Sequence, residues 1–199
     1  MEDEEYKKLP IEERCVHKLW QARKNGYEEV AKTFRQLDDD KSPEFGKYLG
    51  LVKKFVVDSH AVCQEKGLEA TLAFVENYAN AGKTVGEVIT GVVSKCVAAP
   101  KTQTRELAVQ LILMYIEIEK GKAVMEDLIK GREQKNPKIV AACVSASTTA
   151  LREFGPKIVN VKPLIKRISA LCSDRDKTVR DEARSMVVEI YRWIGGALR

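Results

Sequence analysis

The chain has 199 residues, of which 44% are apolar and 32% are charged, and its net charge at neutral pH is +5. This composition is typical of one folded domain with a real core, and the low proline and modest glycine content argue against a disordered chain. Because the basic excess is mild, any strong electrostatic surface must come from clustering of cations.

The start of the chain and its cysteines indicate a compartment. Met1-Glu2-Asp3-Glu4-Glu5 lacks the basic and then apolar pattern of a secretory signal. The best apolar run, residues 107–118, is too short to span a bilayer and contains Gln110 and Glu117. The five cysteines form no C-x-x-C pair and lie in apolar helical runs, so we interpret them as small core residues. These features predict a cytoplasmic protein without a membrane partner.

Apolar residues recur at steps of three and four along nearly the whole chain, which predicts helices throughout. We expect five helix pairs, near residues 11–38, 43–79, 84–119, 121–154 and 162–194. Their first helices include continuous segments over 11–18, 43–57 and 162–173. The turns within the pairs are expected around Trp20, Asp58, Pro100, Lys135 and Asp176.

Helix start signals agree with these segments. Ser42-Pro43 and Asn136-Pro137 each place a capping residue before a proline at the first helical position. Thr84 and Glu87 have the spacing of a capping box, and Asp176 places negative charge at a helix start. Residues 195–199 resemble the start of a sixth pair. Since no polar cap closes the C-terminus, we expect a fragment of a longer protein.

The turns recur at intervals of roughly 35 to 42 residues, which predicts an all-α fold, an α-solenoid of HEAT-type helix pairs that form a flat paddle. A solenoid places its turns along one edge. Lys101, Lys138, Lys177 and Arg180 occupy equivalent places in successive turns. We therefore predict a linear basic edge that binds an acidic partner.

The sequence offers little that resembles catalytic chemistry. Gly82-Lys83-Thr84 is like the end of a phosphate-binding loop, but Asn77 stands where that motif needs glycine and no strand precedes it. His17 and His60 have no acid–nucleophile signature around them. The run Asp38-Asp39-Asp40 is typical of a helix end rather than a metal site. We predict a protein that is not an enzyme and that has no cofactor or metal.

The two tryptophans are interpreted differently. Trp20 is expected at the end of a short helix, beside Lys18 and Arg23. It is either a buried core residue or an exposed interface anchor, because tryptophan is a favoured hot spot. Trp193 closes an apolar stripe, and we predict that it lies in the core.

Longer blocks of the chain resemble the first TOG domain of the ch-TOG/Mini spindles family of microtubule polymerases. The most specific blocks are Lys18-Leu19-Trp20-Gln21-Ala22-Arg23 and Val188-Glu189-Ile190-Tyr191-Arg192-Trp193. The resemblance covers almost the whole chain. It implies that residues 1–199 form a TOG domain of a longer protein with several such domains.

This resemblance implies a monomeric module that binds soluble, curved αβ-tubulin through the turns within its helix pairs. The full-length protein would promote polymerisation at microtubule plus ends and act at the spindle and centrosome. The resemblance places β-tubulin at the Trp20 end and α-tubulin at the Arg180 end. Together with the cation pattern, it gives the candidate tubulin-binding residues Trp20, Val62, Lys101, Lys138, Lys177 and Arg180.

Two alternatives remain open beside tubulin binding. One is a HEAT scaffold that binds a peptide on its helical face, and such a scaffold should ignore substitutions in the turns. The other is a nucleic-acid-binding solenoid, whose affinity should fall steeply with salt and should not need Trp20. We favour tubulin over nucleic acid, and tubulin binding should need both Trp20 and Arg180.

Overall fold

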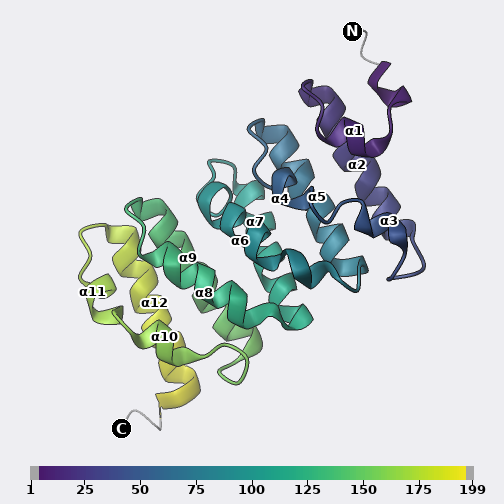
Figure 1. The fold of residues 1–199 in the computed structure, drawn as a ribbon. Helices are drawn as coiled ribbons and strands as arrows, with labels where there is room; N and C mark the ends of the chain where they lie inside the picture. The colour runs from purple at the N-terminus through teal and green to yellow at the C-terminus, as the bar shows by residue number, and fades with distance from the viewer. Residues whose placement is uncertain (1–4, 196–199) are drawn as a thin grey trace. The chain divides into compact units, whose positions relative to one another are not determined.

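A computed structural model describes residues 5–195, which form helices and connecting turns without a β-strand (Figure 1). The prediction of an all-α fold is confirmed. The chain divides into two compact units, one up to Ile118 and one from Glu119 onward. None of the helices in the described range is long and apolar enough to cross a membrane.

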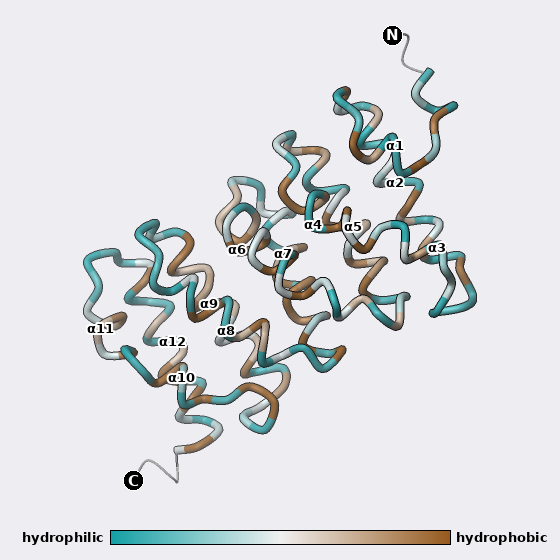
Figure 2. Tube along the Cα trace, viewed as in Figure 1, coloured by the Kyte–Doolittle hydropathy of each residue, from teal (hydrophilic) through white to brown (hydrophobic). Residues whose placement is uncertain are grey.

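The first unit is built around three long helices, α2 (Trp20–Gln36), α5 (Ala61–Asn77) and α7 (Thr102–Tyr115). Helix α5 packs against both α2 and α7. The shorter elements that precede them are η1 (Glu5–Lys8), α1 (Ile11–Cys15), α3 (Pro43–Gly46), α4 (Val52–Phe55), η2 (Ala81–Thr84) and α6 (Val85–Lys95). Figure 2 shows apolar and polar residues interspersed along these helices, as in amphipathic helices that share a core.

The core of the first unit contains a cluster of aromatic rings. Phe34 of α2 lies with its ring centroid 5.3 Å from those of Phe45 and Phe74, and Phe45 stacks on Tyr78 at 4.9 Å. Tyr48 meets the edge of Phe34 at 5.2 Å. Offset and edge-on pairs of this kind stabilise a core beyond their buried area. The cluster therefore fixes α3 and the turn after it against α2 and α5.

Two of the expected helices in this unit are shorter than predicted. The prediction of a continuous helix over 43–57 is wrong, because the chain forms tight turns between α3 and α4. Gly46 and Gly50 lower helix propensity there, and buried Tyr48 turns inward to the aromatic cluster. The first helix ends at Cys15 instead of residue 18. Trp20 therefore begins α2 and does not end the helix before it.

The start of α6 differs from the predicted capping box. The Thr84 hydroxyl makes no hydrogen bond to a helix N–H group. It donates to the Ala81 carbonyl at 2.6 Å and lies 2.7 Å from the Tyr115 hydroxyl. The sequence pattern failed here because a tertiary partner occupies the capping oxygen. By contrast, the predicted caps at Ser42 and Asn136 are confirmed, with each side chain accepting from the N–H two residues on.

Close approach of two helices explains a glycine in the middle of α5. A Cβ atom at Gly67 would overlap the carbonyl group of Phe55 at the end of α4. Replacing Gly67 with alanine is expected to lower the free energy of unfolding by about 1–3 kcal/mol, because backbone must move to make room. Urea unfolding followed by circular dichroism measures this change.

Gly86 provides the matched control, since it also lies inside a helix but has nothing within 4 Å of its virtual Cβ. Alanine at Gly86 should raise stability by up to about 1 kcal/mol through better helix propensity. Equal effects of the two substitutions would mean that α4 and α5 do not approach each other as described.

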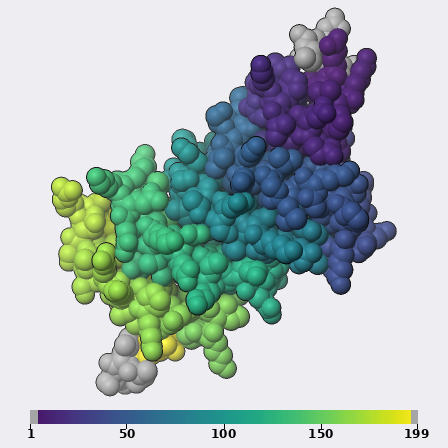
Figure 3. All heavy atoms as spheres, viewed as in Figure 1, coloured from purple at the N-terminus to yellow at the C-terminus, as the bar shows by residue number. Residues whose placement is uncertain are grey.

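The second unit contains α8 (Gly121–Arg132), α9 (Pro137–Phe154), α10 (Val161–Ile165), α11 (Ile168–Cys172) and α12 (Lys177–Ile194). A π-helical turn, η3 (Ile116–Lys120), contains the boundary between the units. Helix α9 packs against α8 and α12. The predicted placement of Asp176 at a helix start is confirmed, and its carboxylate also caps α12 by accepting from the Val179 N–H at 3.0 Å. Figure 3 draws all heavy atoms, which fill much of the space left between neighbouring ribbons of the same unit in Figure 1.

The predicted continuous helix over 162–173 is wrong, because the chain breaks between α10 and α11. Arg167 adopts a left-handed conformation with φ 63°. The buried Arg132 guanidinium donates to the carbonyl oxygens of Leu164 at 3.1 Å and Lys166 at 2.8 Å. A continuous helix would pair these oxygens with N–H groups four residues on. A distant arginine thus stabilises the break, which local sequence could not reveal.

The prediction that Trp193 lies in the core is wrong. Its side chain is 47% exposed, although its Nε1 donates to the buried Glu189 carboxylate at 3.1 Å. One edge of the indole lies against Gly155, 3.5 Å from the position of a virtual Cβ. Periodicity correctly placed Trp193 on the helix face, but it does not show what covers that face. The expected start of a sixth pair falls mostly on residues 196–199, outside the described residues.

Four of the five cysteines are buried, as predicted, and Cys172 is half-buried. Burial raises the pKa of the Cys15, Cys96 and Cys143 thiols to about 12. Burial likewise raises the pKa of Cys63 to about 11. These thiols are therefore uncharged at neutral pH, and they occupy the core as small apolar side chains.

Candidate functional site

Trp20 is the first residue of α2, and 38% of it is exposed. Its indole stacks on the His60 imidazole, with ring centroids 4.2 Å apart and ring planes within 8°. His60 is the residue that caps α5 at its N-terminus. The turns that precede α2 and α5 are thus joined through two rings, and Trp20 is exposed and not a buried core residue.

The Asp58 carboxylate forms hydrogen bonds with both α2 and the start of α5. Its carboxylate accepts from Arg23 Nε at 2.8 Å and Nη2 at 3.1 Å, from the Tyr27 hydroxyl at 2.7 Å, and from the His60 N–H at 3.0 Å. Burial alone would raise the Asp58 pKa, but the hydrogen bonds from Arg23, the His60 amide and Tyr27 outweigh it and lower that pKa. The carboxylate therefore stays charged and links α2 to the start of α5.

Three arginines brace turns in the same way. Arg23, Arg105 and Arg180 are each the fourth residue of a long helix. The Nη1 atom of each one donates to the carbonyl oxygens six and five residues earlier, at distances of 2.7–2.9 Å. These bonds close the turn that leads into the helix. Sequence reasoning missed this role for all three arginines, including Arg180, which it selected only as a partner contact.

Arg180 is consequently not a freely extended side chain. Its Nη1 atom is bound to the carbonyl oxygens of Asp174 and Arg175, both at 2.9 Å, and the residue is half-buried. Removing it would alter the turn as well as any surface contact. A substitution at Arg180 therefore cannot by itself distinguish contact with a partner from support of the turn.

The predicted lysines lie at helix starts and are exposed. Lys101 precedes α7, Lys138 is the second residue of α9, and Lys177 is the first residue of α12. The Lys101 ammonium lies 3.6 Å from Glu65 of α5, and that of Lys177 lies 2.8 Å from Asp181 one helical turn on. Within the described residues Lys138 has no ion-pair partner, so its charge is the least neutralised of the three.

The structure divides the predicted site residues between the two units. The first unit carries Trp20, Val62 and Lys101, and the second carries Lys138, Lys177 and Arg180. In the first unit the Trp20–His60 stack and the Lys101–Glu65 pair bring successive turns together. Val62 is the second residue of α5 and is half-buried. These contacts place the N-terminal ends of α2, α5 and α7 at one edge of the unit.

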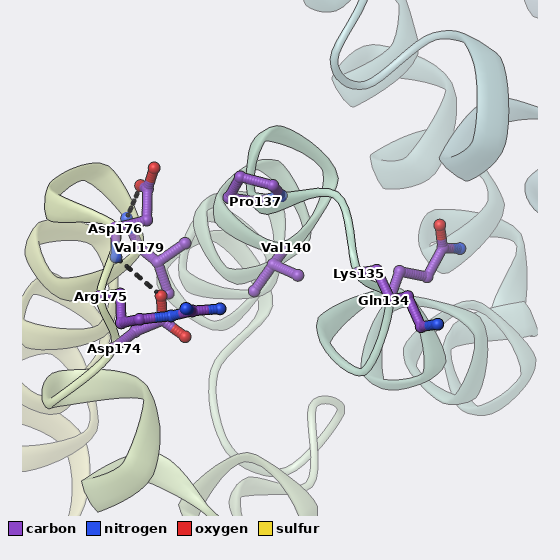
Figure 4. A pocket seen from close by; sticks show the side chains of 8 residues that line it. All are labelled: Gln134, Lys135, Pro137, Val140, Asp174, Arg175, Asp176 and Val179. Atoms are coloured by element: carbon purple, nitrogen blue, oxygen red, sulfur yellow. Dashed lines mark hydrogen bonds between the residues drawn. The ribbon is translucent and has the colours of Figure 1, made fainter.

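In the second unit, the starts of α9 and α12 border a groove of about 440 Å³ (Figure 4). Val140 and Val179 lie between the two helix starts, and the Arg175 side chain extends from its turn toward α9. Lys135 and Gln134 line the other side. Asp174 and Asp176 also line the groove, so it combines an apolar floor with side chains of both charges. Sequence reasoning had not selected Lys135 and Arg175 as site residues.

The helices that follow the turns share an unusual electrostatic pattern. None of α2, α5, α7, α9 and α12 has an acidic residue in its first turn, although Asp176 caps α12. Helix N-termini carry a partial positive charge and ordinarily favour Asp or Glu. Lysines at several of these starts add to that charge. Asp58 and Asp176 place carboxylates in two of these turns. The exposed lysines at the starts of α7, α9 and α12 are therefore the groups suited to an anionic partner surface.

In the described part of the chain, no group of three or more His, Cys, Asp or Glu side chains could hold a metal ion. Lys83 is an exposed residue of η2, and its neighbour Thr84 is buried against Tyr115. The segment at 82–84 is therefore a packed turn before α6 and not an open phosphate cradle.

Known proteins share this sequence and fold. The family model of the XMAP215/Dis1/CLASP TOG domain matches residues 5–199. The protein mini spindles of Drosophila melanogaster is 68% identical over 198 residues, and centrosomal protein 224 of Dictyostelium discoideum is 36% identical over 198 residues. Both matches cover 100% of this chain and 10% of the relative, so the chain spans about a tenth of their length.

Solved structures agree with the solenoid fold. The TOG3 domain of Drosophila melanogaster Mini spindles matches with a TM-score of 0.82 at 21% identity, covering 96% of this chain and 85% of that one. A microtubule polymerase with a TOG domain array matches with a TM-score of 0.84 at 24% identity, covering 92% and 40%. The predicted HEAT-type architecture is confirmed, and this chain belongs to the TOG domain family of XMAP215/Dis1/CLASP proteins.

Proposed function

We propose that this chain is a non-catalytic module that binds αβ-tubulin through the turns before α2, α5, α7, α9 and α12. The observation that carries this proposal is the combination of an exposed tryptophan at the start of α2 with exposed lysines at the starts of α7, α9 and α12. A cation near a helix N-terminus destabilises the free protein by a few tenths of a kcal/mol to about 1 kcal/mol. An acidic partner reverses that effect, and tubulin is acidic.

Each candidate residue has a role in this proposal. Trp20 would insert against β-tubulin as an aromatic anchor, with Val62 as an apolar contact in the next turn. Lys101, Lys138 and Lys177 would steer encounter and fix register. Arg180 would face α-tubulin while also holding its own turn.

The names of related proteins support a role at microtubules. One relative is mini spindles, another is a centrosomal protein, and a similar structure belongs to a microtubule polymerase that recruits tubulin. We propose that this chain is the first of several TOG domains in a longer polymerase that acts at plus ends, the spindle and the centrosome. It would bind tubulin as a monomer and prefer the curved dimer, since release into a straight lattice requires different affinities for the two shapes.

Size-exclusion chromatography of the chain with αβ-tubulin tests the proposal. A co-migrating one-to-one complex is expected from the wild type, and a Trp20→Ala, Lys138→Glu double variant should lose it. This pair of changes avoids Arg180, whose removal would disturb a turn. If the wild type fails to shift, the tubulin proposal is wrong. If both proteins shift equally, the partner is right and the turn edge is not its site.

The free charge of Lys138 allows a second test. Lys138→Glu is expected to slow association with tubulin several-fold and to weaken its salt dependence, because rim charges act mainly on the association rate. Stopped-flow mixing at two ionic strengths measures both effects. Lys122→Glu, an exposed residue of α8 away from the turns, is the matched control. Equal slowing by both variants would show that net charge alone, and not the turn edge, controls encounter.

A further inference from the structure

We propose that His60 is a positioning residue that holds the Trp20 indole in its binding orientation. The consequence for affinity rests on the proposed tubulin function, whereas the ring support itself belongs to the free protein. Near-parallel rings 4.2 Å apart place the imidazole flat against one face of the indole. Among the described aromatic residues, His60 is the one ring partner of Trp20.

On another side Trp20 borders a groove of about 250 Å³, which Tyr6 and Lys7 of η1 line together with Gln21, Lys24, Asn25 and Glu28. An exposed tryptophan at the first position of a helix has several accessible rotamers, because the helix has no preceding turn there to restrict it. Among the described residues, the His60 ring is the one that stacks on the indole, and it restrains the indole from that face.

His60 itself is fixed from the helix that carries Trp20. Its N–H donates to Asp58, and Asp58 is held by Arg23 and Tyr27, both of α2. The Cys63 thiol, one helical turn after His60, donates to the Trp20 carbonyl oxygen at 3.2 Å. His60 and Trp20 are thus linked through hydrogen bonds of both backbone and side-chain groups.

The hydrogen bonding of the His60 ring differs from that of a satisfied core histidine. Its Nδ1 atom is buried without a hydrogen-bond partner. A buried polar atom without a partner is unfavourable for folding. What the imidazole contributes in return is a flat π-face of suitable size against the indole. The geometry is that of a platform and not of a hydrogen-bonded core histidine.

A ring that is already oriented loses less rotamer freedom on binding. Immobilising one side chain at an interface weakens affinity by a factor of about two to ten, which preorganisation avoids. We therefore expect His60→Leu, which keeps bulk but removes the π-face, to weaken tubulin binding about two- to tenfold. His60→Phe keeps a ring in place and should retain most of the affinity.

Proton NMR of the free protein tests the stack without tubulin. The chain has two histidines, so its imidazole signals can be assigned with a His17→Gln variant. The His60 ring protons should be shifted upfield by the indole ring current and should return toward ordinary positions in Trp20→Ala. Unshifted His60 protons in the wild type would overturn the proposal, whether or not the chain binds tubulin.

Titration calorimetry with αβ-tubulin completes the test. A loss with His60→Leu that His60→Phe restores supports the platform. Equal affinities of all three proteins would overturn it, because the orientation of Trp20 would then not depend on the ring. Equal losses in both variants would also overturn it, since His60 would then act by its own contact with tubulin. Absence of binding by the wild type refutes the proposed function and leaves the NMR result to decide on the stack.

Discussion

Replacing Trp20 with alanine is expected to weaken binding of αβ-tubulin by about 2–4 kcal/mol, or about 30- to 1000-fold. The indole is exposed in the free protein and supported on one face, so it can be desolvated by a partner with little reorganisation. Titration calorimetry measures the loss directly. Because Trp20 is at the exposed start of α2, the variant should fold normally, which circular dichroism can verify.

Trp193→Ala is the matched control for this prediction. It removes a tryptophan of similar exposure, 47% against 38%, from a helix face that the proposal does not use. Its tubulin affinity should equal that of the wild type. Wild-type affinity in Trp20→Ala would remove the central element of the proposed interface.

The second large effect is expected from Asp58→Ala, which should lower the free energy of unfolding by about 2–4 kcal/mol. The substitution leaves the Arg23 guanidinium and the buried Tyr27 hydroxyl without their shared acceptor. Urea unfolding measures the change. Asp181→Ala, which removes a carboxylate from an exposed pair with Lys177, should change stability little. Comparable losses of unfolding free energy in the two variants would show that the Asp58 hydrogen bonds contribute no more than an exposed ion pair.

The same network predicts the direction of a pH effect. The Asp58 pKa is lower in the folded protein than in the unfolded chain. Its stabilisation is therefore complete above the ordinary aspartate pKa of about 3.9 and is lost as the pH falls toward the lower folded-state pKa. Between these values, the stability difference between wild type and Asp58→Asn should shrink as the pH is lowered. A difference that stays constant through this acidic range would contradict the assignment.

The helical architecture was predictable because each long helix carries its own apolar period, and α9 and α12 also carry start signals. The cap at Asn136 and the helix start at Lys177 depend on neighbours in sequence, and both were found. Breaks were not predictable where distant groups stabilise them. The chain between α10 and α11 is one example, because buried Arg132 binds its free carbonyl oxygens. The cap predicted at Thr84 failed for a similar reason, since a distant residue, Tyr115, occupies its hydroxyl.

The candidate site shows the same division. The position of Trp20 in a turn and the recurrence of lysines are visible in sequence, so these residues could be selected. What could not be inferred is how they are supported. The stack of Trp20 on His60 and the charge link from Asp58 to Arg23 join turns more than 30 residues apart. The bracing role of Arg180 depends on turn geometry that residue type alone does not give.

The reactivity of the buried cysteines can report local unfolding of the protein. A thiol with a pKa near 12 and no solvent contact reacts with a thiolate-directed reagent only when its surroundings unfold. Cys15, Cys63 and Cys96 lie in the first unit, and Cys143 lies in the second. The time course of labelling at each sulfur, read by mass spectrometry, would therefore measure how often each half of the chain exposes its interior. A bound partner that contacts one half should slow labelling there first.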